Sequence, residues 1–179
     1  PDHALSYSEY KLIPVDGSVA PDPGMEALAQ SLKAKVNENY LSRFGLGYDQ
    51  VITRADQDFT TAQTGDLIGW AYIETVKGIE GENYVPIAFA VAPDGVIRDR
   101  IRQGDVTTSQ AFDILSLGSG ADGSPGYPLV SVYLTGKDLK NAFEVDASVS
   151  ALMPAAELCG AGSGWTYNPH RMFLDRVTA

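Results

Sequence analysis

Arg98 is the residue with the strongest potential for chemistry. It follows a glycine-containing turn, Asp94-Gly95-Val96, that comes soon after the apolar run Tyr84–Val91. The run predicts a strand, so a permanently charged guanidinium stands near a strand end, where proteins commonly bind anions and other ligands. The same side chain could instead form an ion pair with Asp94 or Asp105. The sequence favours neither interpretation over the other.

The other reactive side chains do not form a catalytic set. His3 and His170 are isolated, whereas a hydrolytic metal site needs several His and carboxylate ligands on adjacent loops. The single cysteine, Cys159, excludes an internal disulfide and a cysteine-based zinc site, and we expect it to be a small apolar filler. Walker A and G-x-S-x-G motifs are absent, and no G-x-G-x-x-G follows a predicted strand. We therefore expect no catalytic residue, no metal ligand and no cofactor site within these residues.

Charge and hydropathy exclude several classes of partner. The 179 residues include 13 basic and 23 acidic side chains, which give a net charge of −10. This charge repels nucleic acid and anionic membrane surfaces. No apolar run is long enough to span a bilayer, and no signal-peptide pattern is present. The chain opens on Pro1, so we expect it to be an excised or processed piece of a longer protein.

Two long helices are predicted in the first half of the chain. The first begins at Asp22-Pro23 and ends at Phe44-Gly45, and we expect its apolar stripe to be buried in the core. That stripe consists of Met25, Leu28, Leu32, Val36 and Tyr40. The second covers about residues 64–77, with an expected inner face of Leu67, Ile68, Ala71, Thr75 and Val76.

The second half alternates predicted helices, strands and loops. Capping boxes at Thr107-x-x-Gln110 and Thr135-x-x-Asp138 predict two helix starts, the second of a helix over residues 136–152. Strands are expected at residues 51–53, 129–134, 165–167 and 172–177, a loop at 118–128, and a flexible stretch at 160–164. No repeat or second core is visible. We therefore expect a single α+β domain over residues 1–179, with a mixed β-sheet packed with helices.

Four short motifs occur in a fixed order around Arg98. They are Asp94-Gly95-Val96-Ile97-Arg98, Gly104-Asp105-Val106-Thr107, Ser116-Leu117-Gly118-Ser119 and Leu134-Thr135-Gly136-Lys137-Asp138-Leu139. In order and spacing they resemble the N-G-G-I-R, G-D-I-T, P-F-G-N and L-T/S-G-K-E-L motifs of the C-terminal domain of the 5'-nucleotidase and UDP-sugar hydrolase family of metallophosphoesterases. Weaker similarity extends from Arg54 to about Val177.

The resemblance implies a substrate-recognition role. In that family an N-terminal metallophosphoesterase domain holds a pair of divalent metal ions and the nucleophilic water, and the C-terminal domain supplies the nucleotide pocket. Arg98 matches the arginine of the I-R motif. Arg54 falls where another family arginine lies, although for Arg54 we favour a structural role over a substrate contact. Leu117, Gly118 and Ser119 match the motif that contacts the base. The resemblance thus implies these five residues as substrate contacts, and the chain's own N-terminal domain as its partner.

Two departures from the family pattern affect the base pocket. The stacking Phe of P-F-G-N is Leu117 here, which loses an aromatic term of about 0.5–1.5 kcal/mol, and the following Asn is Ser119. The family's late aromatic-G-G-D-G-Y segment has no counterpart in these residues. We therefore expect weak purine binding, or preference for a ligand without a large flat base.

Two functions follow from these features. One is recognition of a nucleotide or other phosphoester for a periplasmic or extracellular 5'-nucleotidase-type phosphohydrolase, with the metals and hydrolysis located upstream of Pro1. The other is a non-catalytic binding or interaction module that keeps the fold with a degraded nucleotide pocket. On either hypothesis this stretch alone is expected to be inactive.

Overall fold

The structure, a computed structural model, describes residues 7–121, 123, 126–162 and 164–178. The chain divides into two compact units, Pro1–Gly47 and Tyr48–Ala179. The single domain expected over residues 1–179 stays a prediction.

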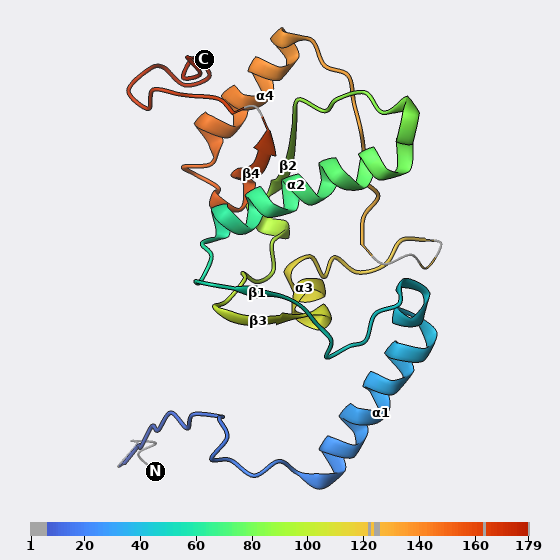
Figure 1. The fold of residues 1–179 in the computed structure, drawn as a ribbon. Coiled ribbons are helices and arrows are strands. Elements are labelled where there is room, and N and C mark those ends of the chain that lie inside the picture. Colours follow the sequence, from blue (N-terminus) through green and yellow to red (C-terminus); the bar gives the residue numbers. More distant parts are fainter. Residues whose placement is uncertain (1–6, 122, 124–125, 163, 179) are drawn as a thin grey trace. The chain divides into compact units, whose positions relative to one another are not determined.

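The described part of the first unit contains one α-helix, α1 (Pro23–Asn39), followed by a 3-10 turn at Leu41–Phe44 (Figure 1). The Asp22 side chain accepts a hydrogen bond from the Met25 amide at 2.9 Å, and Pro23 occupies the first turn, as the sequence predicts. Gly45 ends the turn in the left-handed conformation, with φ of 66°. The start of the helix is confirmed, and its end comes five residues before Phe44.

The apolar stripe of α1 is not buried, which corrects the expectation from its spacing. Four members, Met25, Leu28, Leu32 and Val36, are between 38% and 63% exposed, and no residue of α1 is buried. An amphipathic helix buries its apolar face only where another element covers it. The described part of this unit has no second long helix and no strand, so nothing within it covers the stripe.

The described residues of the second unit form two antiparallel two-stranded sheets and three α-helices (Figure 1). The elements, in chain order, are β1 (Val51–Ala55), α2 (Thr61–Glu80), β2 (Phe89–Pro93), β3 (Gly104–Thr107), α3 (Thr108–Ile114), α4 (Gly136–Val149) and β4 (Leu158–Gly162). Strand β1 pairs with β3, and β2 pairs with β4. The α+β class is confirmed.

The sheets differ from the mixed sheet that we expected, because the strand predicted at 129–134 does not form. Its large apolar residues lie in an extended segment that leads into α4 and are 42% to 85% exposed. No described strand pairs with this segment, and β-branched residues give a strand only where a neighbour supplies hydrogen bonds and packing. At 165–167 and 172–177 the two expected strands are reduced to one antiparallel bridge, Tyr167 with Val177.

Helix α2 packs on β2 and β4, and two glycines on its inner face make that contact possible. A Cβ at Gly65 would collide with the Cys159 side chain, and a Cβ at Gly69 would lie 2.5 Å from the Ala161 amide nitrogen. The buried face is therefore Thr64, Gly65, Ile68, Gly69 and Ile73. Of the inner face that we expected, only Ile68 is fully buried, and Leu67 is exposed. Likewise Gly160–Gly162, expected to be flexible, belongs to β4.

Two apolar clusters form the core of this unit. The first joins both sheets, α2 and α3, and its buried members are Ala55, Ile68, Ala92, Ile101, Val106 and Ile114. The second surrounds Phe143 of α4, which stacks on Trp165 at 4.0 Å between ring centroids. The Glu144 carboxylate, 4% exposed, accepts hydrogen bonds from the backbone amides of Arg176 and Val177 at 2.6 and 2.9 Å. These bonds fix the segment around Val177 on α4.

Candidate functional site

The backbone around Arg98 is fixed by the elements on either side of it. Strand β2 leads into a 3-10 turn at Asp94–Val96, whose first amide donates to the Glu157 carbonyl at 2.7 Å. The Arg98 amide donates to the Ile114 carbonyl, the last residue of α3, at 2.8 Å. Ile97 packs against the first core cluster. The guanidinium of Arg98 is thus carried by an anchored main chain, although the side chain itself is exposed.

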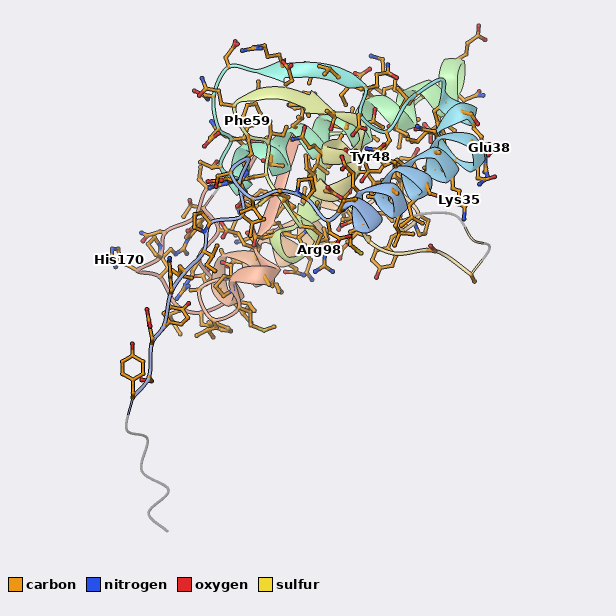
Figure 2. The ribbon with its side chains drawn as sticks, turned by 90° about the horizontal axis from the view of Figure 1, so that it is seen from below. Lys35, Glu38, Tyr48, Phe59, Arg98 and His170 are labelled. Carbon is orange, nitrogen blue, oxygen red and sulfur yellow. The ribbon has the colours of Figure 1, made fainter. Side chains whose placement is uncertain are left out.

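Arg98 lines a shallow hollow of about 250 Å³ together with Thr61, Ile97, Asp99 and Arg100. Thr61 comes from the first turn of α2, and the other four are consecutive in the loop after β2 (Arg98 is labelled in Figure 2). Among the described residues, no ion pair joins Arg98 to Asp94 or Asp105. Both ion pairs that we considered for Arg98 are therefore wrong, and Arg98 instead lines this open hollow.

Arg54 lies elsewhere, in an ion pair. Its Nη1 is 3.0 Å from Oδ1 of Asp105, directly across the β1–β3 register, and the two side chains are 72% and 57% exposed. Cross-strand pairs of this exposure contribute about 0.2–1 kcal/mol. Arg54 does not line the hollow that contains Arg98. The structure therefore gives Arg54 a structural contact, and a substrate contact for it stays a prediction.

Leu117, Gly118 and Ser119 follow the end of α3. Leu117 is half-buried, Gly118 has φ of 81°, and Ser119 is exposed. The Arg98 amide donates to the Ile114 carbonyl, and Ile114 precedes Leu117 by three residues in the chain. None of the three residues lines the hollow, so the structure brings the two motifs to neighbouring backbone but not into one pocket.

Arg100 and Thr61 are residues of the hollow that we did not predict. The signal for Arg100 was present as the alternation Arg98-Asp99-Arg100-Ile101-Arg102, in which Ile101 is buried and the four charged residues are exposed. Thr61 had no local signal, because only the fold brings the start of α2 to the loop after β2.

A second hollow of about 270 Å³ lies over the Phe143–Trp165 stack. Its lining is mostly apolar and contains one charged residue, Lys140. It is slightly larger than the hollow at Arg98, but its chemistry is that of an incompletely covered core. The hollow with two arginines offers the charged donors that an anionic ligand needs, so it is the candidate site for such a ligand.

The remaining reactive side chains fit structural roles. Cys159 is buried, and burial together with the acidic groups around it raises its pKa to about 11, so the thiol stays protonated at neutral pH. This agrees with a filler rather than a nucleophile. His170 is exposed, and its side chain extends away from the ribbon (Figure 2), whereas His3 lies outside the described residues.

The described residues do not fit a hydrolytic metal centre. In the part of the chain that the structure describes, no group of three or more His, Cys, Asp or Glu side chains could hold a metal ion. Within the same residues, no helix is long and apolar enough to cross a membrane.

Comparison with known proteins agrees with the motifs. Residues 32–179 match the family described as 5'-nucleotidase, C-terminal domain. Among solved structures, a 5'-nucleotidase precursor from Thermus thermophilus is similar, with a TM-score of 0.55 and 21% identity over 88% of this chain. The match covers 29% of the Thermus chain, so the present chain corresponds to less than a third of it. No curated protein matches. The chain belongs to the 5'-nucleotidase C-terminal domain family.

Proposed function

We propose that this chain is the substrate-recognition domain of a 5'-nucleotidase-type, metal-dependent phosphohydrolase. In this proposal Arg98 binds the phosphate or ribose oxygens of a nucleotide or another phosphoester. The observation that carries the proposal is the position of Arg98, on a backbone held by the Ile114 carbonyl. Its side chain lines a hollow and, among the described residues, is not ion-paired with Asp94 or Asp105. A guanidinium suits this role because it presents planar paired donors and keeps its charge at physiological pH.

Hydrolysis in this proposal belongs to a different part of the protein. The chain's own N-terminal metallophosphoesterase domain supplies the pair of divalent metal ions and the activated water. The similarity to a 5'-nucleotidase precursor supports this arrangement, as does the lack of a metal-ligand cluster among the described residues. A periplasmic or extracellular location is part of the same proposal, by analogy with the family.

A second candidate is a non-catalytic binding module with a degraded nucleotide pocket. It is favoured by one observation, that Leu117 and Ser119 replace the family's Phe and Asn and do not line the hollow with Arg98. The coding sequence upstream of Pro1 distinguishes the two candidates. D-x-H and G-N-H-D/E motifs there support the phosphohydrolase, and a different domain supports the module.

Calorimetric titration tests the recognition role. AMP, adenosine and inorganic phosphate are titrated into the wild-type chain, Arg98→Gln and Arg171→Gln. Arg171 is a matched control, because it is an exposed arginine that does not line the hollow. Its Nη2 lies 2.8 Å from Oδ2 of Asp175. We expect AMP and phosphate to bind wild type and the Arg171 variant equally, and to bind Arg98→Gln on the order of tenfold more weakly. Equal binding by all three proteins would contradict the role of Arg98.

A further inference from the structure

The extended segment at residues 129–134 has the composition of a strand but no strand beside it. Among the described residues, no main-chain group of this segment takes part in a hydrogen bond. The segment runs as an extended coil into α4 (Figure 1). A row of free amides and carbonyls on a β-prone segment is a template for pairing with a further strand.

Both faces of the segment are also uncovered. Successive side chains of an extended chain point to opposite faces. On one face Val130, Val132 and Leu134 are 77%, 63% and 52% exposed. On the other face Leu129 is 42% exposed and Tyr133 is 85% exposed. Covering these side chains removes apolar surface from water, which is the dominant favourable contribution to protein association.

The occupant that this segment fits is a second copy of itself. Residues 126–136 contain no charged side chain, in a chain with a net charge of −10. Two copies repel each other over most of their surfaces, and an uncharged stretch lets them approach without placing like charges together. The segment also lacks the charged side chains by which exposed strands usually avoid pairing edge to edge.

We infer that the chain forms a two-fold symmetric dimer in which residues 129–135 of two copies pair as antiparallel strands, with the axis at Val132. In this register Val132 lies opposite its counterpart, and Val130 lies opposite Leu134. One face of the ladder then holds three aliphatic side chains from each copy without interruption. Pro128, which has no amide hydrogen to donate, falls beyond the end of the ladder. The interface is isologous and closed, so it stops at two copies.

The second hollow extends the surface that this dimer covers. Gly136 and Leu139, two residues of its lining, directly follow the segment in the chain. The proposed register brings Tyr127 of the second copy to the end of the ladder, where the hollow begins. Tyr127 and Tyr133 are 69% and 85% exposed, and burial of about 150–250 Å² a ring gives roughly 300–500 Å² per copy. The aliphatic side chains add to this area, and a stable interface needs roughly 600–1,000 Å² from each partner.

The mass of the full chain in solution tests the dimer. Light scattering and sedimentation are measured from micromolar to submillimolar concentration. Wild type should move from the 19.1 kDa monomer towards twice that mass as concentration rises. Val132→Lys should dimerise at least on the order of tenfold more weakly, because it places two positive charges directly opposite each other on the axis.

Val15→Lys is the matched control for that variant. It makes the same change of charge at a valine that is 89% exposed and lies outside the segment, and it should dimerise like wild type. Circular dichroism and thermal unfolding establish that each variant is folded.

Cross-linking tests the register. Opposite residues of an antiparallel pair have Cα atoms about 4.5–5.5 Å apart, within the range that a disulfide spans. Val132→Cys should therefore link two chains under mild oxidation. Val130→Cys should not, because the two copies of residue 130 lie four residues apart along the ladder, or about 13 Å. Wild type controls for Cys159, which is buried and should not link.

Four results overturn the inference. If wild type stays at 19.1 kDa at every concentration, the segment has a different occupant, such as a strand of another protein. If species larger than two copies form, the interface is not closed. If Leu32→Lys, in the exposed stripe of α1, abolishes the dimer and Val132→Lys does not, the copies meet through α1. If Val130→Cys links as readily as Val132→Cys, the register is wrong. None of these results bears on the role of Arg98, which lies in a different hollow.

Discussion

The close approach of α2 to β4 depends on Gly69 having no side chain. Alanine is normally the better residue inside a helix by about 1 kcal/mol, so Gly69→Ala should stabilise α2 considered alone. In the folded chain, however, the new Cβ would lie 2.5 Å from the Ala161 amide nitrogen and 3.0 Å from the Ala161 Cβ. A backbone atom of a paired strand cannot move aside as the end of a flexible side chain can. We expect a net destabilisation of about 1–3 kcal/mol, the usual cost of overpacking.

Gly78→Ala is the matched control for this prediction. Gly78 lies in the same helix, and a Cβ there would meet nothing within 4 Å. It should gain the helix propensity without a clash, which amounts to about 0.5–1 kcal/mol of added stability. Urea unfolding followed by circular dichroism gives both free energies of unfolding. If Gly69→Ala is as stable as Gly78→Ala, the packing of α2 on β4 described above is wrong.

Three further predictions concern reactivity, the ligand and catalysis. Because the pKa of Cys159 is raised to about 11, alkylation by iodoacetamide should be slow at pH 8 in the folded chain and fast in urea. Ionisation of the Cys159 thiol should lower the free energy of unfolding only as pH rises from about 9 towards 11. Fast alkylation of the folded protein at pH 8 would argue against burial of this thiol. Leu117→Phe should tighten AMP binding by about 0.5–1.5 kcal/mol in calorimetry and leave inorganic phosphate unchanged; no gain for AMP would show that Leu117 is not beside the base. The chain alone should release no phosphate from AMP or UDP-glucose with added divalent metal, and metal-dependent release by a pure preparation would contradict this.

Helix starts could be predicted from the sequence because their signals are local. Asp22 accepts from the amide of Met25, Thr107 from Gln110 and Thr135 from Asp138, and each cap lies within three residues of its partner. The motif around Arg98 was visible for the same reason.

Contacts between distant residues could not be predicted in this way. Arg54 and Asp105 are 51 residues apart, and only the pairing of β1 with β3 makes them neighbours. The sequence predicted the wrong buried face for α2, because the spacing of apolar residues gives no weight to glycine. In the structure Gly65 and Gly69 belong to the buried face, since they allow α2 to approach β4 closely. The strand expected at 129–134 had the right composition, but strand formation also needs a partner, which composition does not specify.

The central claim is that the loop of Arg98 recognises a phosphoester, and mapping of the bound ligand by NMR tests it most directly. AMP is added to the 15N-labelled chain, and amide shifts are followed residue by residue. We predict that the largest changes occur at Thr61 and at residues 97–100 around the hollow, and that they are lost in Arg98→Gln. Changes centred instead on Lys140, Phe143 and Trp165 around the second hollow, or no changes at millimolar AMP, would contradict the claim.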